Sequence, residues 1–436
     1  MSKSSIVEWV EKNRSSIINF LQGFLKVPSP NPPGDTRSAS AYVEHFLKER
    51  KIDYKIVDPD PEKPNIVSSF AAPSPGRSLI LNGHIDVFPV GDGKNWSHDP
   101  WGGELVDGRI YGRGACDMKA GTTASIWTYA YLYDIRRKLK GKLTLTVVSD
   151  EESGGRLGSG WLIDNLPEVV GDCCLNGEPS SPYTLRFGEK GPLWLKVTVN
   201  TLGGHGAYPH LSPNAIKIAA RLIADLDALT EVPIPYPENL AQALIEGRDA
   251  AERALDAGGA DMMKKVSVNI GTVSGGLKIN MIPRECTFEL DIRLPPGISK
   301  ENIIPLIQSI TSRYPEVKIE EIRYDAPNWS PPYGEMPQII RANSRLLGID
   351  PKPIISLGAS DLKFWRAKGV PSYYYGPTNH GMGTIDEYVE VKELIHIIKV
   401  HLLSAYEYLQ RDYFVKTLRS TMLNARAVQH TRGFIA

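Results

Sequence analysis

The stretch SLILNGHID, residues 78–86, decides the fold class of this 436-residue chain. Its apolar residues form a short continuous run without helical spacing, which is typical of a strand buried on both faces of a parallel sheet. His84 and Asp86 stand at the carboxyl end of this run. In open α/β sheets, ligands bind at that end of the strands. The sequence therefore predicts a buried strand that delivers an imidazole and a carboxylate to a site.

A second apolar run ends in acidic residues. It is KLTLTVVSDEE, residues 142–152, and its last residues are Glu151 and Glu152. Between the two strands, residues 117–137 follow the glycine-rich YGRGACD and show the pattern of a long helix. A strand, a helix and a strand in this order predict a parallel α/β sheet.

Helical patterns flank this core at both ends of the chain. Apolar residues at helical spacing predict helices over residues 6–27 and 38–51, and again over 337–347 and 391–409. A short strand is expected over residues 372–375. These elements would complete the first domain.

The pattern changes at about residue 193, where LWLKVTVN alternates apolar and polar residues as a half-exposed antiparallel strand does. Two helices and two further strands are expected after it, over residues 214–229, 299–314, 266–273 and 286–294. We therefore expect a smaller domain, residues 193–326, inserted into a discontinuous first domain of residues 1–192 and 327–436.

Composition excludes several classes of protein. The 50 Lys+Arg residues balance 50 Asp+Glu residues, so the formal net charge is zero. Proteins that bind nucleic acids or anionic membranes carry a cationic excess instead. No stretch approaches the roughly 18 to 20 consecutive apolar residues of a membrane span, and the N-terminus lacks the apolar core of a signal peptide. We expect a cytoplasmic protein that acts on a small molecule.

Further acidic residues stand near the predicted strand ends. Asp117 opens the predicted long helix after a glycine-flanked turn, and Glu178 follows another apolar run in NGEPSS. Imidazole and carboxylate groups that converge at one sheet edge suit a divalent ion such as Zn²⁺. A carboxylate that bridges two such ions, about 3.5–4 Å apart, makes a hydrolytic two-metal centre.

The two pairs of neighbouring polar residues, Glu151 with Glu152 and His84 with Asp86, are each expected to divide metal binding and a supporting role between their members. At a strand-to-loop turn, one of Glu151 and Glu152 can bind metal while the other faces the bound water. His84 and Asp86 share a strand face, so Asp86 can orient the imidazole. A helix cap or a loop salt bridge is the alternative reading of Asp86.

Seven motifs occur in the order found in the M20 metallopeptidase family, which the chain resembles from about residue 15 to residue 410. They are GHIDVFPVGDGKNWSHDPWGG, DGRIYGRGACDMKAG, SDEESGG, NGEPSS, GGHGAYPHLSPNAI, NMIP and DIR. The resemblance implies a zinc-peptidase-like α/β catalytic domain with a central, mostly parallel sheet, interrupted by a smaller α/β sandwich that acts as a lid. It also implies an amide or peptide hydrolase, since the family includes deacetylases, desuccinylases, aminoacylases, carboxypeptidases and dipeptidases.

The resemblance implies a role for each residue of the cluster. Asp117 would bridge two zinc ions, for which cobalt or manganese would be the expected substitutes. Glu151 would be the general base that takes a proton from water, with Asp86 as its companion behind His84. The remaining metal ligands would be His84 and Glu178 for the first ion and Glu152 for the second.

Three residues of the inserted domain resemble the family's lid groups. His205 precedes Asn214 at the family's spacing and would stabilise an oxyanion in a neighbouring active site, which implies a homodimer formed through the lid. Arg293 of DIR would grip a substrate carboxylate with its planar fork, and Asn280 of NMIP would also hold the substrate. The alternatives are an interdomain salt bridge for Arg293 and a turn residue for Asn280.

One segment departs from the family pattern. The family places a metal-binding histidine four residues before a glutamate, and here GPTNHGMGTIDEYVEV has Gly383 at that position. His380 lies three residues earlier. Either this loop bulges and His380 completes the second metal site, or that site is incomplete.

The predicted reaction is hydrolysis of an amide or peptide bond in a dipeptide or an N-acyl amino acid, with the acyl group left open. The alternative is a family member whose altered second site binds, condenses or cyclises an amino-acid-derived substrate. A serine or cysteine hydrolase is disfavoured because no GxSxG occurs and Cys116 has no predicted base partner. A nucleotide enzyme is disfavoured because GRGACDMKAG is not a GxGxxG motif after a strand.

Overall fold

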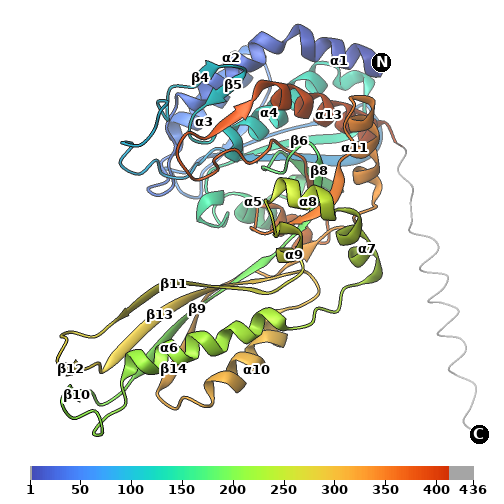
Figure 1. The fold of residues 1–436 in the computed structure, drawn as a ribbon. Coiled ribbons are helices and arrows are strands. Elements are labelled where there is room, and N and C mark those ends of the chain that lie inside the picture. The colour runs from blue at the N-terminus through green and yellow to red at the C-terminus, as the bar shows by residue number, and fades with distance from the viewer. Residues whose placement is uncertain (1, 412–436) are drawn as a thin grey trace, which may run out of the picture.

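The computed structural model describes residues 2–411. A larger part holds a sheet between helices, and a narrower, elongated part extends from it (Figure 1). Residues 412–436, which the sequence assigns to the first domain, lie outside the described residues. No helix within residues 2–411 has the length and apolar character needed to cross a membrane.

The predicted strand at residues 78–86 is central to the larger sheet. It is β3 (Ser74–His84), and it pairs in parallel with β6 (Lys140–Val148) on one side and β7 (Cys173–Asn176) on the other. β17 (Ser372–Tyr374) continues the parallel pairing beyond β7. Because β3 and β6 end at His84 and Val148, the residues that follow them emerge at one edge of the sheet. The prediction of a central, mostly parallel sheet is confirmed.

Shorter strands complete the sheet, which has nine strands within residues 2–411. Beyond β6 are β2 (Asn65–Ala71) and β1 (Lys55–Val57), and beyond β17 are β8 (Thr184–Glu189), β15 (Asn328–Trp329) and β16 (Lys352–Ser356). A separate small sheet contains β4 (Glu104–Val106), β5 (Arg109–Tyr111) and β18 (Tyr388–Glu390).

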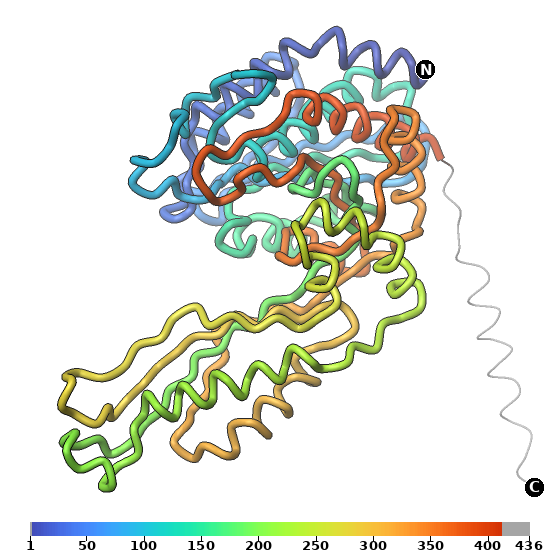
Figure 2. The backbone as a smooth tube through the Cα atoms, viewed as in Figure 1, coloured from blue at the N-terminus to red at the C-terminus, as the bar shows by residue number. Residues whose placement is uncertain are grey.

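Helices cover both faces of the larger sheet. On one face, α4 (Ala120–Asp134) packs against α13 (Val391–Gln410), and both bury long apolar stretches. α1 (Lys3–Lys12) lies along α13, so the two ends of the described chain are neighbours (Figure 2). The same apolar core includes residues of α2 (Arg14–Leu25), α3 (Arg37–Glu49) and α11 (Glu335–Leu346). A second apolar cluster on the sheet contains residues of α5 (Ser159–Asn165) and α12 (Leu362–Ala367).

The elongated part has its own antiparallel sheet and its own core. The strand order is β11 (Ser267–Gly275), β13 (Glu285–Leu294), β9 (Gly191–Asn200) and β14 (Val317–Tyr324). The apolar residues of β9 and β13 alternate along each strand and meet α6 (Ala215–Leu226) and α10 (Lys300–Thr311) in one buried cluster. A two-stranded pair, β10 (Gly204–His205) and β12 (Met281–Ile282), lies at the far tip.

The structure differs from the sequence-based expectation in three segments. The predicted helix over residues 6–27 is two helices that meet at Asn13. The helix predicted from Asp117 begins only at Ala120, because Asp117 and Met118 have non-helical backbone angles. Three short helices of the predicted insert pack partly into the core of the larger part, since their apolar residues find a partner there. They are α7 (Glu238–Glu246), α8 (Arg248–Ala254) and α9 (Gly259–Met262).

Candidate metal centre and active site

The structure gathers carboxylates around the imidazole of His84 at the end of β3. His84 Nε2 lies 3.3 Å from Asp117 Oδ1, 3.6 Å from Glu178 Oε1 and 4.0 Å from Glu151 Oε2. Asp117 comes from the turn before α4, Glu151 from the turn after β6 and Glu178 from the loop after β7. Residues separated by nearly a hundred positions therefore meet because their strands end at the same sheet edge.

The donor atoms of this cluster suit a divalent cation. One ligand atom from each of His84, Asp117 and Glu152 lies within 4.8 Å of the others. Three buried atoms, His84 Nε2, Glu152 Oε1 and Glu178 Oε1, have no hydrogen-bond partner. Buried polar atoms are normally paired, so unpaired imidazole and carboxylate atoms that lie together are the arrangement expected of metal ligands. The residues present fit a metal ion.

The electrostatics of the metal-free cluster point the same way. Burial raises the pKa of Glu152 and of Glu178 well above the usual range. Burial also raises the pKa of Glu151 to about 8, with the His84 imidazole opposing the shift and Asp361 adding to it. Burial opposes charge on His84, but Glu178, Asp117 and Asp86 outweigh it and raise the pKa of the imidazole. A bound cation would stabilise the charged form of several buried acids that have only one histidine beside them.

Asp86 holds the turn that carries the two glutamates. Its Oδ1 accepts a hydrogen bond from the Glu151 N–H group at 3.2 Å, and its Oδ2 accepts one from the Glu152 N–H group at 3.1 Å. His84 Nδ1 lies 2.9 Å from the Asp86 carbonyl oxygen and 3.5 Å from Asp86 Oδ1. Asp86 thus contacts both the imidazole and the turn of residues 151–152.

Glu387 supports the turn that carries Asp117. Sequence reasoning used this residue only to align the family glutamate and missed its structural role. Its Oε1 accepts hydrogen bonds from the N–H groups of Cys116 (2.9 Å) and Asp117 (3.1 Å). Its Oε2 forms a buried ion pair with Arg113 Nη1 at 2.6 Å. The available signal was its position in IDEYV, where an acid directly precedes a strand.

Asp361 is a second acid that sequence reasoning missed. Its Oδ2 accepts a hydrogen bond from the Ser159 hydroxyl at 2.8 Å, and its Oδ1 is buried without a hydrogen-bond partner. Burial raises the pKa of Asp361 to about 7. The stretch GASDLKFW contains no local pattern that marks this acid as buried beside Glu151.

The structure does not place His380 in the group formed by His84, Asp117 and Glu152. The His380 ring stacks on Tyr388 with 4.4 Å between centroids, and its Nε2 lies 4.0 Å from Glu393 Oε2. That Nε2 is nevertheless buried without a hydrogen-bond partner. Gly383 has a positive φ of 72° and only Phe88 near the position of a Cβ.

The three residues predicted to act in a lid lie in two places. His205 in β10 and Asn280 beside β12 are exposed at the tip, where the Gly206 N–H group donates to the Asn280 carbonyl oxygen at 2.8 Å (Figure 1). Arg293 lies at the other end of β13, and its Nε and Nη2 donate to the two carboxylate oxygens of Asp291 at 2.7 and 2.8 Å. The structure thus does not bring the three together, and the Arg293 guanidinium is paired with Asp291 within the four-stranded sheet.

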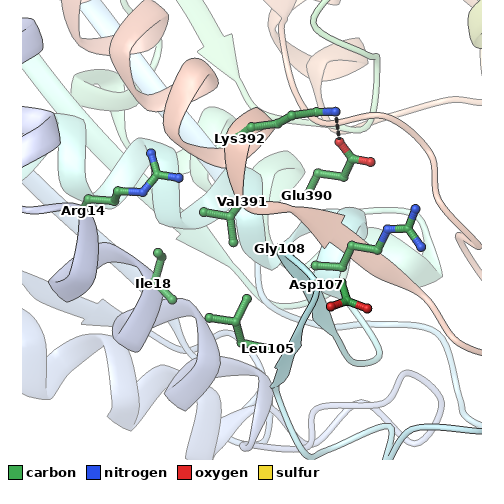
Figure 3. Close-up of a pocket in the computed structure, with 9 residues that line it drawn as sticks. Arg14, Ile18, Leu105, Asp107, Gly108, Glu390, Val391 and Lys392 are labelled. Carbon is green, nitrogen blue, oxygen red and sulfur yellow. Dashed lines mark ion pairs between the residues drawn. The ribbon is translucent and has the colours of Figure 1, made fainter.

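A surface pocket lies apart from these residues, at the start of α13 (Figure 3). It has a volume of about 460 Å³, and its lining combines cations, acids and apolar side chains. They are Arg14, Ile18, Leu105, Asp107, Gly108, Arg109, Glu390, Val391 and Lys392. None of the predicted site residues lines it.

Comparisons with known proteins agree with the motifs. The chain is 29% identical over 404 residues to a succinyl-diaminopimelate desuccinylase of Cereibacter sphaeroides, covering 89% of this chain and 97% of that protein. Its fold is similar to that of an M20 family metallo-carboxypeptidase from Sulfolobus solfataricus, with a TM-score of 0.74, 16% identity, and coverage of 90% and 99%. The dipeptidase Dug1p from Saccharomyces cerevisiae gives a TM-score of 0.71, with 16% identity and coverage of 94% and 99%.

A family model extends this agreement over most of the chain. The model described as peptidase family M20/M25/M40 matches residues 80–407. That range includes every residue of the cluster around His84. The protein is thus a metal-dependent hydrolase, and its chain belongs to peptidase family M20/M25/M40.

Proposed function

We propose that the protein hydrolyses an amide or peptide bond in a small substrate that carries a carboxylate, such as a dipeptide or an N-acyl amino acid. The observation that supports this most is the buried cluster around His84 Nε2, whose donor atoms lack partners. A relative named as a desuccinylase is consistent with an acyl amide as substrate. The named relatives do not favour the alternative of a condensing or cyclising protein.

The cluster is proposed to hold two zinc ions. His84 and Glu178 would bind the first, Glu152 would bind the second, and Asp117 would bridge them. Bound divalent ions supply two things here: they acidify a water molecule toward neutral pH and they polarise the scissile carbonyl. His84 and Glu178 are almost completely buried, so these two side chains are held in place beneath the cluster.

Glu151 is proposed as the general base. Its Oε2 lies 4.0 Å from His84 Nε2, so it borders the cluster, yet it is not in the group of mutually close donor atoms. Burial raises the pKa of Glu151, and cations bound beside it would lower that pKa again, toward the ionised form that accepts a proton. Glu151 would take the proton of the attacking water and then pass it to the departing amine nitrogen.

His380 is proposed to complete the second metal site. Its buried Nε2 has no hydrogen-bond partner, as expected of an imidazole nitrogen that binds a metal ion. Three glycines surround or follow it in the loop, and Gly381 and Gly383 both have positive φ angles. This loop geometry would let His380 serve in place of the family histidine that Gly383 replaces.

The predicted insert, residues 193–326, which forms most of the elongated part, is proposed to be a lid and the dimer interface. Because β10, which contains His205, and β12, which follows Asn280, lie at its far tip (Figure 1), the two residues would serve the active site of a second copy. His205 would stabilise the oxyanion and Asn280 would hold the substrate there. Arg293, at the other end of β13, would grip a substrate carboxylate once it releases Asp291. We further propose that the protein works in the cytoplasm.

A substrate panel tests the proposed function. Zinc-loaded protein is incubated with dipeptides and N-acetyl and N-succinyl amino acids, and the released primary amine is measured. The E151Q variant, loaded in the same way, is the control for hydrolysis outside this site. Hydrolysis of at least one class well above the E151Q rate is expected. Equal rates for both proteins on every member would contradict the proposal.

A further inference from the structure

Asn31, in the loop between α2 and α3, has no role in the function proposed above. We propose that Asn31 is a positioning residue: it holds the Asp86 carboxylate and the turn of residues 151–153 in the geometry that hydrolysis requires. The inference rests on the proposed function, and it also predicts an effect on metal binding that is measurable without any substrate.

The amide of Asn31 joins two parts of the site. Its Nδ2 donates to Asp86 Oδ2 at 2.9 Å and to Ser153 Oγ at 3.1 Å. Asn31 is 5% exposed and Asp86 is fully buried, so water does not compete for the first of these bonds. Both hydrogens of the amide nitrogen are therefore used to tie the end of β3 to the turn after β6.

Asp86 transmits this contact to the two glutamates. The Asp86 oxygen that accepts from Asn31 also accepts from the Glu152 N–H group, while the other oxygen accepts from the Glu151 N–H group. Rotation of the Asp86 carboxylate would break its hydrogen bonds to the N–H groups of Glu151 and Glu152. The Asn31 amide is the side-chain donor to Asp86 Oδ2, while His84 Nδ1 lies 3.5 Å from Oδ1, so Asn31 helps to fix the plane of the carboxylate and, through it, the backbone of both glutamates.

The backbone holds Asn31 itself in place. The Asn31 N–H group donates to the Val87 carbonyl oxygen at 2.8 Å, and the Val87 N–H group donates to the Ser29 carbonyl oxygen at 3.0 Å. The Ser29 hydroxyl donates to the Ile85 carbonyl oxygen at 2.6 Å. Residues 29–31 thus run beside residues 85–87 and are hydrogen-bonded to them. This pairing restricts the position of the Asn31 side-chain amide.

Gly34 shows how closely the loop surrounds this side chain. It has a φ of +92°, and a Cβ at this position would lie 2.9 Å from Asn31 Oδ1. The loop therefore closes around the amide oxygen and leaves the amide nitrogen facing Asp86. A side chain without this donor cannot replace the contact.

The chemistry of the contact requires a neutral donor. An aspartate at position 31 would have nearly the same shape but would bring acceptor oxygens toward the Asp86 carboxylate. An alanine would remove the donor and leave one Asp86 oxygen with a single hydrogen bond. Loss of such an outer contact typically lowers metal affinity or activity by about 10- to 100-fold.

The test compares N31A, N31D and N31S with the parental protein in the metal-loaded state. We expect kcat to fall about 10- to 100-fold with KM nearly unchanged, because Asn31 acts through Asp86. We also expect weaker metal binding in chelator competition and an altered visible absorption spectrum of the Co²⁺-loaded protein. Asn165→Ala removes an exposed amide that bonds only to the Trp161 carbonyl oxygen, and it should change none of these readouts.

The outcomes separate the two proposals. If the parental protein hydrolyses no substrate, the proposed function fails. The metal affinity and the Co²⁺ absorption spectrum of the variants then still decide whether Asn31 is a positioning residue. If N31A does not fold, N31D and N31S provide the same comparison. If the folded variants have the same kcat, the same metal affinity and the same Co²⁺ spectrum as the parental protein, the positioning role is overturned. A rise in KM without a fall in kcat would also overturn it.

Discussion

The backbone N–H group of Asp117 donates to the buried carboxylate of Glu387 at 3.1 Å. On the other side of the cluster, Asp86 accepts from the N–H groups of Glu151 and Glu152 in the same manner. Two buried carboxylates outside the proposed ligand set thus hold the two turns that supply the proposed bridging ligand and the proposed base. The positions of the reactive side chains depend on these backbone contacts.

The E387Q variant is expected to lose stability and metal affinity. Glutamine keeps an acceptor for the Cys116 and Asp117 N–H groups but leaves Arg113 buried without its 2.6 Å ion pair. Breaking a buried pair on one side costs about 3–5 kcal/mol of unfolding free energy. Denaturant unfolding measures this loss. The control E104Q removes a surface pair with His98 and should cost less than about 1 kcal/mol; equal losses for both variants would contradict the role of Glu387.

The E151Q variant is expected to bind metal as the parental protein does and to lose turnover. Glutamine has the size of glutamate but cannot take a proton from water. General-base catalysis contributes about 10²- to 10⁴-fold, so kcat should fall by at least that factor. Metal content by elemental analysis and kcat on the best substrate are measured together. Parental turnover in E151Q would refute the assignment of the base.

The metal-free protein is expected to lose stability as pH rises. Burial raises the pKa of Glu151 from 4.5 to about 8, so between these values the folded state binds more protons than the unfolded state. The unfolding free energy then falls with increasing pH over this interval. The raised pKa of His84 acts in the same direction above pH 6.5. Denaturant unfolding of E151Q should show a shallower decline, and a stability that rises over the interval would contradict the prediction.

His205 is expected to act in the active site of the partner copy. The H205A variant should lose about 10²- to 10³-fold in kcat, as for the loss of one oxyanion donor. Mixing inactive H205A with inactive E151Q should restore activity, because a mixed dimer contains one site with an intact base and an intact histidine. Activity that stays at the level of the separate variants after subunit exchange would contradict this arrangement.

The central elements of the fold were predictable because their patterns are strong. Residues 78–84 form a strand with no helical period, and residues 391–409 repeat apolar residues over five turns of helix. α7 to α9 were not predicted, since their short apolar stretches acquire a partner only when the chain folds back onto β16. The break at Asn13 was also missed, because the apolar spacing continues across it.

Part of the site was predictable for a similar reason. His84, Glu151 and Glu178 each follow an apolar run after two intervening residues, and sheet topology alone brings such residues together. Asp361 was missed because its importance comes from burial, which no local pattern shows. Glu387 served only to align the family pattern, because its contacts with the Cys116 and Asp117 N–H groups appear only in the fold. Asn31 lies in a proline-rich turn that predicts only the end of a helix.

Anomalous X-ray diffraction from crystals grown with zinc tests the central claim most directly. Data collected on both sides of the zinc absorption edge should show one peak beside His84, Asp117 and Glu178 and a second beside Asp117 and Glu152. His380 should approach the second peak. Crystals of the zinc-loaded protein with no anomalous peak at His84 Nε2 would contradict the account.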